Sequence, residues 1–275
     1  MDSVLKCETR SISRRHFAQL AAVGAAMAAA RPAIAQATSE TVRWRLTSSF
    51  PKNLDTLFGG ANTICRIVGE LTDGKFSIQP FAAGEIVPGL QVLDAVSNAT
   101  VECGQTYTGY YIGKEPAMIF DGSLPFGLTP RQHSAWLLFG DGRKVAKYYY
   151  TPGVMELEAF NQLFINKATW AALPPAYQAA LRYACWYALN EMLASYDAKN
   201  AKAINRVVAG GAQLSVLSPE IIKALRGALE SVLDEEAGKN PLFKKILDNW
   251  RQWRAEQHRW FGIADTRAEL AVYST

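Results

Sequence analysis

The sequence predicts an α/β fold, in which a parallel sheet with helical connections is followed by a helix-rich carboxyl-terminal part. Between residues 42 and 104, segments with strand periodicity alternate with segments of helical periodicity, which is typical of a β-α-β-α-β order. After Leu173-Pro174-Pro175, apolar residues recur mostly at helical spacing. The 275 residues are 49% hydrophobic, as expected for a globular chain rather than a disordered one.

An export signal is expected to precede this fold. Ser13-Arg14-Arg15-His16-Phe17 leads into an apolar, alanine-rich stretch over residues 18–30, and Ala33-Ile34-Ala35 supplies the small residues of a cleavage site. The stretch is too short for a convincing membrane anchor. The adjacent arginines predict twin-arginine export of an already folded protein, with an ordinary Sec signal as the alternative. We therefore expect a soluble periplasmic protein, cleaved after Ala35.

The mature chain carries little net charge. Removing residues 1–35 takes away five basic and two acidic side chains, which lowers the formal charge from +4 to +1. A nucleic-acid partner is not expected, because that function needs Lys and Arg clustered on one face. Cys7 leaves with the signal, whereas Cys65, Cys103 and Cys185 remain without CxxC spacing, so one disulfide or three free thiols are both consistent with the sequence.

Alternation and helical periodicity indicate the elements of the first part in turn. Val42, Trp44 and Leu46 share one face of the first strand, and Asp73-Gly74 ends the first helix. The expected elements are strands over residues 42–47, 75–80 and 100–104 and helices over residues 53–71 and 89–97. In a sheet of this kind, ligand sites lie where the carboxyl ends of the strands meet the loops.

Capping and turn residues indicate the later elements. Thr129 as N-cap, Pro130 at the first position and Gln132 in a capping box predict a helix start. Strands are expected over residues 147–150 and 163–166, joined by the Pro152-Gly153 turn. A long helix over about residues 177–208, a short strand over 214–216 and helices that begin at Pro219 and Pro241 complete the chain.

Catalytic machinery is sparse in this sequence. His133 and His258 are the only histidines outside the signal, and neither has the spacing of a zinc site. The chain contains no G-x-S-x-G elbow and no phosphate-binding glycine loop. We read His133 as a polar residue in a capped first turn. The sequence therefore predicts no enzyme, no metal site and no cofactor.

Aromatic residues are more informative, although they allow two interpretations. Tyr107, Tyr110 and Tyr111 follow the third expected strand, and three more tyrosines occupy residues 148–150. Tyrosines at strand ends suit a pocket for a small polar acid, because each offers a flat wall and a hydroxyl donor. Ordinary core packing is the alternative. Trp250, Trp253 and Trp260 are expected to share a helix face, which favours packing or a dimer interface.

Several segments together resemble a known family. They are Thr47-Ser48-Ser49-Phe50-Pro51-Lys52, Phe81-Ala82-Ala83-Gly84-Glu85, Glu102-Cys103-Gly104, the run from Tyr110 to Pro116, Pro125-Phe126-Gly127-Leu128 and Phe164-Ile165-Asn166-Lys167. Their order and spacing, over nearly all of the mature chain, resemble the periplasmic solute-binding proteins of TRAP-type transporters for C4-dicarboxylates and α-keto acids.

The resemblance implies a type II periplasmic-binding-protein-like clamshell. In such a protein, two lobes close over a carboxylate solute and present it to the membrane subunits of a TRAP transporter, without any chemistry on the solute. Some members of the family dimerise through a long C-terminal helix, and the face that carries Trp250 and Trp260 is the candidate for a homodimer here.

The chain departs from the family by an internal truncation. In the family, a long segment between the Trp136 region and the tyrosine-rich strand carries much of the second lobe and an arginine in a Met-Arg-Ile-like context. That arginine would hold the solute carboxylate by two parallel hydrogen bonds. Here Gly142-Arg143-Lys144 runs directly into Val145. We therefore expect an export signal over 1–35, a first α/β lobe over 36–142, a remnant of the second lobe over 143–168 and a helical part over 169–275 that completes the lobes.

The expected function is capture of a small α-keto acid or dicarboxylate, impaired by the truncation. Phe50 and Tyr110 are the expected pocket walls, and Ser49, Tyr111 and Asn166 the expected hydrogen-bond partners. A non-binding remnant or protein-interaction subunit is the first alternative. A secreted enzyme on the same scaffold is the second, and it would need an acid, base or nucleophile cluster in the cleft.

Overall fold

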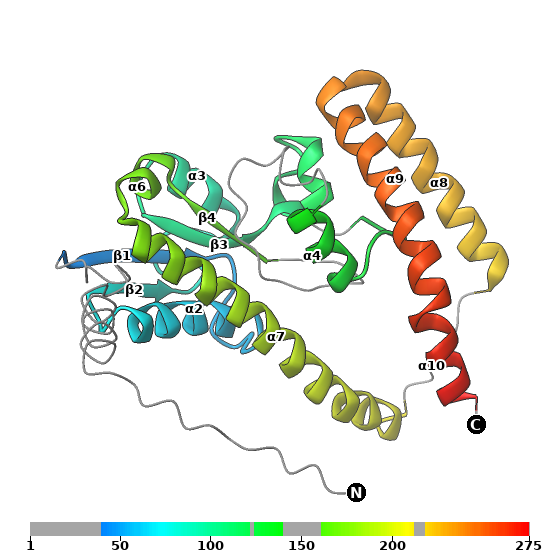
Figure 1. Ribbon diagram of the computed structural model, residues 1–275, viewed down its shortest axis with the longest axis horizontal. Coiled ribbons are helices and arrows are strands. Elements are labelled where there is room, and N and C mark those ends of the chain that lie inside the picture. Colours follow the sequence, from blue (N-terminus) through cyan, green and yellow to red (C-terminus); the bar gives the residue numbers. More distant parts are fainter. Residues whose placement is uncertain (1–39, 122–123, 140–160, 212–217, 275) are drawn as a thin grey trace, which may run out of the picture. The chain divides into compact units, whose positions relative to one another are not determined.

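A computed structural model describes residues 40–121, 124–139, 161–211 and 218–274 (Figure 1). These residues belong to one compact unit, Glu40–Thr275. The export signal with Cys7, the strands expected over 147–150 and 214–216, the Pro152-Gly153 turn and the junction at residues 142–145 lie outside the described residues.

A four-stranded sheet with the order β2-β1-β3-β4 forms the centre of the first part. β1 (Val42–Ser48) pairs in parallel with β2 (Phe76–Phe81) and with β3 (Cys103–Tyr107). This confirms the parallel sheet with helical crossovers. β4 (Asn161–Ile165) is added antiparallel to β3, with Cys103 opposite Ile165 and Tyr107 opposite Asn161.

The third strand lies three residues later than the sequence pattern suggested. Residues 100–102 precede β3, and Glu102 uses its side chain to accept hydrogen bonds from Arg45 on β1 instead of occupying a strand position. Tyr107 is therefore part of β3 and does not follow it.

Helices connect the strands as expected. α2 (Leu57–Leu71) joins β1 to β2. The short helices η1 (Gly89–Gln91) and α3 (Val92–Ser97) lead into β3. α3 packs closely on the sheet, because a Cβ on Gly104 would lie only 2.5 Å from Val92 Cγ1. η2 (Thr108–Tyr111) and η3 (Pro116–Asp121) follow β3.

The carboxyl-terminal part is helical, as the periodicity predicts. α4 (Pro130–Phe139) begins with the expected capping box: the Thr129 amide donates to Gln132 Oε1 at 2.9 Å. The remaining helices are α6 (Lys167–Ala172), α7 (Pro175–Ala209), α8 (Pro219–Lys239), α9 (Pro241–Ile263) and α10 (Asp265–Tyr273). α10 is an additional helix that the sequence analysis did not separate from the one beginning at Pro241. Within the described ranges, no helix has the length and apolar character needed to cross a membrane.

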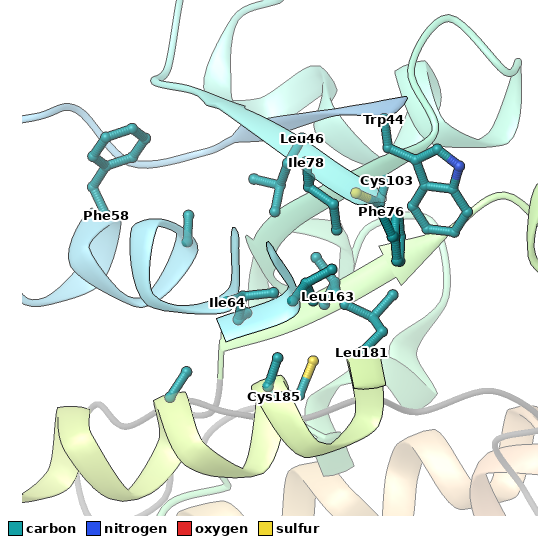
Figure 2. Close-up of a cluster of buried hydrophobic side chains, with 14 of the residues drawn as sticks. Trp44, Leu46, Phe58, Ile64, Phe76, Ile78, Cys103, Leu163, Leu181 and Cys185 are labelled. Atoms are coloured by element: carbon teal, nitrogen blue, oxygen red, sulfur yellow. The ribbon is translucent and has the colours of Figure 1, made fainter. Parts of the chain in front are cut away.

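The main hydrophobic core lies between the sheet, α2 and the first half of α7. Figure 2 shows Leu181 and Cys185 pointing from α7 toward Ile64 of α2 and Leu163 of β4. All four side chains are buried. This packing fixes one face of the sheet and leaves the carboxyl ends of β1 and β3 to the loops.

A second core joins η3 and the region of α4 to the hairpin of α8 and α9. Phe120 of η3 packs against Phe243 and Trp250 of α9, with ring centroids 4.9 and 6.1 Å apart. Trp136 of α4 donates a hydrogen bond to Asn249 at 2.9 Å. Trp250 is therefore a core residue, and of the three tryptophans expected on one face only Trp260 is largely exposed, at 58%.

Cys65, Cys103 and Cys185 are free thiols, which resolves the alternative that the sequence left open. Cys103 and Cys185 are buried in the main core. Burial raises the pKa of Cys65 to about 12 and also raises the pKa values of Cys103 and Cys185. The three thiols are therefore protonated and unreactive at neutral pH.

Candidate functional site

The carboxyl ends of β1 and β3 meet at one edge of the sheet. β1 and β3 are adjacent and parallel, with Ser48 opposite Gln105, so Ser49 and Phe50 leave the sheet beside Thr106 and Tyr107. This edge holds four of the five residues expected to contact a solute. It is also where ligands bind in open α/β sheets.

Phe50 lies in the main core instead of on an open wall. Its side chain is only 4% exposed. The Phe50 amide donates to Ser48 Oγ at 3.1 Å, and Ser48 donates to Gln105 Oε1 at 2.8 Å. Gln105 in turn donates to the Leu57 carbonyl at the start of α2, at 2.8 Å. The buried Phe50 amide and Ser48 hydroxyl thus fix the turn after β1. Phe50 therefore anchors this turn in the main core and does not form an open wall of the site.

Ser49 and Tyr111 are brought together through Thr106. Thr106 Oγ1 lies 2.6 Å from Ser49 Oγ and 2.9 Å from Tyr111 Oη. Ser49 also donates to the Gly89 carbonyl at 2.6 Å, and Tyr111 accepts from the Leu93 amide at 3.3 Å. Both predicted hydrogen-bonding residues therefore already have partners within this edge of the fold.

Tyr110 is the exposed tyrosine of the site. Tyr110 is 46% exposed, and its ring packs edge to face on the ring of Tyr107, with centroids 5.3 Å apart. Partial burial, together with Tyr107 and Tyr111, raises the pKa of the Tyr110 phenol. The phenol is therefore protonated at neutral pH and can donate a hydrogen bond to an acid.

Asn166 is not part of this group. It follows Ile165, which pairs with the first residue of β3, so it lies at the opposite end of the sheet. Its Oδ1 caps α6 by accepting from the Ala168 amide at 3.0 Å, and its Nδ2 donates to the Val96 carbonyl at 3.0 Å. The expectation that Asn166 lines the same cleft fails because β4 runs antiparallel to β3.

Two of the segments that carry the family resemblance meet beside the site. Lys52, after β1, pairs with Glu85, after β2, with Nζ and Oε1 2.5 Å apart. The Ala83 amide donates to the Phe50 carbonyl at 3.1 Å. The ion pair is exposed and contributes little to stability. Its position shows that the two segments form adjoining turns at one edge of the sheet.

A buried polar group borders the other side of β3. Gln162 of β4 accepts a hydrogen bond from the Thr108 amide at 2.9 Å and donates to the backbone carbonyl of Asp121 at 2.5 Å. Asp121 is 3% exposed, and neither of its carboxylate oxygens has a hydrogen-bond partner among the residues that the structure describes. Burial raises the pKa of Asp121 well above its usual value, an effect that the Gln162 amide opposes only in part. Sequence patterns alone did not indicate this group.

Neither histidine lies in an arrangement suited to catalysis. His133 is 1% exposed and packs edge to face on Trp136, and burial lowers its pKa to about 3, so its ring is neutral at pH 7. His133 lies in the capped first turn of α4, as expected, since its amide donates to the Thr129 carbonyl at 2.8 Å. Its ring, in addition, belongs to the interior. His258 is exposed on α9. Among the residues with described positions, no group of three or more His, Cys, Asp and Glu side chains comes together to hold a metal ion.

Sequence patterns did not indicate Thr106, Gln105 or Gly89 as residues of the site. The first two have no local motif, and only the strand alternation indicates that Gln105 and Thr106 point to opposite faces of β3. A Cβ on Gly89 would lie 2.8 Å from the Ser49 carbonyl oxygen, so the loop before α3 approaches the end of β1 closely.

Comparisons with known proteins agree with this arrangement. The family model described as "Bacterial extracellular solute-binding protein, family 7" matches residues 47–147 and 140–240. A monocarboxylate 2-oxoacid-binding periplasmic protein of Nostoc sp. is 32% identical over 319 aligned positions, which cover 82% of this chain and 87% of the relative.

Solved structures show the same fold. A TRAP transporter solute-binding protein from Bordetella bronchiseptica, described as a mixed-occupancy dimer with co-purified calcium and picolinate in one active site, is 31% identical with a TM-score of 0.80; the match covers 86% of this chain and 98% of that one. A TRAP periplasmic solute-binding protein from Pseudoalteromonas atlantica, with bound sodium and pyruvate, is 17% identical with a TM-score of 0.78 over 84% of this chain and 99% of that one.

The comparisons are also consistent with an internal truncation. The alignment with the Nostoc protein spans 319 positions, more than the 275 residues of the whole chain, so it includes positions at which this chain has no residue. The two family matches meet at residues 140–147, where the sequence analysis expects the missing part of the second lobe. The chain belongs to the bacterial extracellular solute-binding proteins of family 7, the periplasmic receptors of TRAP transporters, and it is a binding protein rather than an enzyme.

Proposed function

We propose that this chain is a receptor for a small monocarboxylate 2-oxoacid such as pyruvate, and that it binds its solute weakly. The identity of 32% with the Nostoc 2-oxoacid-binding protein carries the choice of solute. The exposed Tyr110 hydroxyl at the joint edge of β1 and β3 supports it, because a neutral phenol can donate to a carboxylate from a flat apolar surface.

The truncation is the reason to expect weak binding. A clamshell receptor gains affinity by enclosing its ligand between two lobes, which excludes water and adds contacts from the second side. The proposed truncation takes contacts away from the second side, and the sequence contains no arginine in the Met-Arg-Ile-like context that the family resemblance implies. Loss of a charged bidentate contact costs about 1.5–3 kcal/mol, equivalent to about a 10- to 150-fold loss of affinity.

Titration calorimetry on the cleaved chain tests the proposal. Pyruvate is expected to bind with a Kd in the millimolar range, about −4 kcal/mol, and more tightly than succinate. Tyr110→Phe should weaken pyruvate binding by about tenfold, the value of a hydrogen bond to a charged acceptor. Tyr183→Phe, at an exposed tyrosine on α7 that is 70% exposed, is the matched control and should change nothing.

Two results would contradict the proposal. Absence of saturable pyruvate binding would favour the non-binding remnant, and preference for succinate would reject the 2-oxoacid. Equal losses in Tyr110→Phe and Tyr183→Phe would show that the Tyr110 hydroxyl does not contact the solute.

The proposal includes the membrane subunits of a TRAP transporter as the partner that receives the solute. It also includes export, with cleavage after Ala35, and a division into a first lobe over 36–142, a second-lobe remnant over 143–168 and a helical part over 169–275. The signal pattern of Arg14-Arg15 and Ala33-Ile34-Ala35 supports the cleavage position. Mass spectrometry of the periplasmic protein would reveal a different amino terminus if this position is wrong.

We further propose a homodimer that uses the α8–α9 hairpin. Exposed apolar residues lie on both helices: Ile221, Ile222, Leu225 and Val232 on α8, and Trp260 and Ile263 on α9. The Bordetella relative is described as a dimer. Because Trp250 is buried, Trp260 is the tryptophan available for such an interface. Trp260→Glu should convert a concentration-dependent dimer to monomer in sedimentation velocity, and a protein that is already monomeric would reject this interface.

A further inference from the structure

Three hydroxyl groups form a continuous row at the site edge. Ser49 Oγ lies 2.6 Å from Thr106 Oγ1, and Thr106 Oγ1 lies 2.9 Å from Tyr111 Oη. The row ends on the Gly89 carbonyl, 2.6 Å from Ser49 Oγ, and on the Leu93 amide, 3.3 Å from Tyr111 Oη. Thr106 is fully buried and Tyr111 is 2% exposed, so water has little access to the middle of the row.

Thr106 is the shared partner of the other two hydroxyls. The Ser49 hydroxyl is directed at two acceptors, the Gly89 carbonyl and Thr106 Oγ1, and its single hydrogen is shared between them. The bond between Thr106 Oγ1 and Tyr111 Oη can run in either direction, and the Leu93 amide donates to Tyr111. Without the Thr106 hydroxyl, Ser49 and Tyr111 would each lose a partner inside the fold.

The row begins and ends on the same short segment. Gly89 opens η1 and Leu93 lies in α3, whereas the three hydroxyls come from the end of β1, from β3 and from η2. The bonds thus tie four pieces of chain into a closed loop around Thr106. Linked hydrogen bonds polarise one another, so the loss of the middle member affects the bonds on both sides.

We propose that Thr106 is the positioning residue of the candidate site at the carboxyl ends of β1 and β3, because its hydroxyl fixes Ser49 and Tyr111 in place. Of Ser49, Tyr110 and Tyr111, Tyr110 then has the hydroxyl that is available to bind a solute. This inference rests on the proposed function, because it assigns the solute contact. Ser49 is bonded to Gly89 and Thr106, and Tyr111 to Thr106 and Leu93, so a solute carboxylate could take either hydroxyl only by breaking the row. Tyr110 is exposed and precedes Tyr111 in η2, so the bond between Thr106 and Tyr111 also holds the segment that carries Tyr110.

Matched variants at Thr106 separate the hydroxyl from the shape of the side chain. Thr106→Val keeps the shape and removes the hydroxyl, so Ser49 and Tyr111 each lose a hydrogen-bond partner. We expect it to lower the melting temperature by about 2–10 °C. Thr106→Ser retains the hydroxyl and should restore most of this loss. Equal losses in the two variants would overturn the proposal, because they would indicate packing alone.

Coupling between Thr106 and Tyr111 gives a readout that packing does not produce. Tyr111→Phe should lower the melting temperature less in the Thr106→Val background than in the native chain, because the bond between them is already absent. The Leu93 amide should also exchange hydrogen faster in Thr106→Val than in Thr106→Ser. Additive losses, or an unchanged Leu93 amide, would overturn the row as one unit.

Pyruvate titration of the same variants tests the link to the solute. Thr106→Val should weaken pyruvate binding by about fivefold, and Thr106→Ser by less than about twofold. If both bind as the native chain does, Thr106 does not position the solute contact. If the native chain itself does not bind pyruvate, the proposed function fails, whereas the melting, coupling and exchange measurements still decide whether Thr106 holds the row together.

Discussion

Asp121 offers a strong test of the electrostatics of this fold. The residue is the last of η3 and is 3% exposed, and within the described ranges neither of its carboxylate oxygens has a hydrogen-bond partner. No charged side chain contributes to its pKa, which burial raises well above the usual value. Ionisation of Asp121 therefore places an unpaired charge in the interior, which is unfavourable. Replacement by Asn keeps the size of the side chain and removes the charge.

The sign of the pH dependence follows from proton binding. In the unfolded chain, the Asp121 carboxyl has a pKa of about 3.9. Between that value and the raised pKa of the folded state, the folded chain holds a proton that the unfolded chain has lost, so the free energy of unfolding falls as pH rises. At pH values below both pKa values, Asp121 is protonated in both states and does not change the free energy of unfolding. Asp121→Asn removes the destabilisation at high pH and should raise the free energy of unfolding at pH 8 by about 1–3 kcal/mol.

Urea unfolding followed by circular dichroism measures this difference. The difference in free energy of unfolding between Asp121→Asn and the native chain should increase from pH 4 to pH 8. The free energy of unfolding of the native chain can fall by as much as about 1.4 kcal/mol for each pH unit because of Asp121. Asp197→Asn, at an exposed position on α7, is the matched control and should show no such increase. A variant less stable than the native chain at pH 8, or a difference independent of pH, would refute the reasoning.

Two further predictions concern packing and thiol chemistry. Gly104→Ala should lower the free energy of unfolding by about 1–3 kcal/mol, because the new Cβ would lie 2.5 Å from Val92 Cγ1 and 2.9 Å from Val96 Cγ2. Gly69→Ala in α2, where a Cβ meets nothing within 4 Å, is its control, and thermal melting that ranks the two variants in the opposite order would contradict the tight packing of α3. Cys65, Cys103 and Cys185 should react with a thiol reagent at pH 8 only after unfolding, because burial holds their pKa values high. Rapid labelling of the native chain would show that at least one thiol is accessible.

The sequence predicted the sheet well because its signals are local. Alternation in β1, the stripe of α2 and the capping box at Thr129 each depend on near neighbours, and the structure contains all three. Asn166 could not be placed in the same way. Its position at the far end of the sheet depends on the antiparallel direction of β4, which is set by pairing between residues about sixty positions apart. Local periodicity contains no information on that direction.

The candidate site was only partly predictable for the same reason. Tyr110 and Tyr111 are neighbours in the sequence, yet one is exposed and the other is 2% exposed, because η2 turns them to different sides. Thr106 lies beyond the strand that the sequence predicted over 100–104, and its role depends on Ser49 and Tyr111, whose hydroxyls lie within hydrogen-bond distance of its own. Asp121 was not singled out because its significance comes from burial, which the sequence around it does not indicate.

The long helix α7 links the truncation to the expected loss of affinity. Its first half packs on α2 through buried residues up to Met192, and Tyr196 still contacts the main core. Farther along, Ala203 and Val207 continue the same face, but Val207 is 51% exposed and its neighbour Ile204 is 42% exposed. Lys199 interrupts this face and pairs with Asp55 at 2.7 Å, so among the described residues the exposed apolar side chains of this face lie in the last turns of α7. Exposed apolar side chains that lie together are typical of a surface that another part of a protein covers. Under the proposed function, one missing segment accounts for both the expected weak capture and the exposed end of α7.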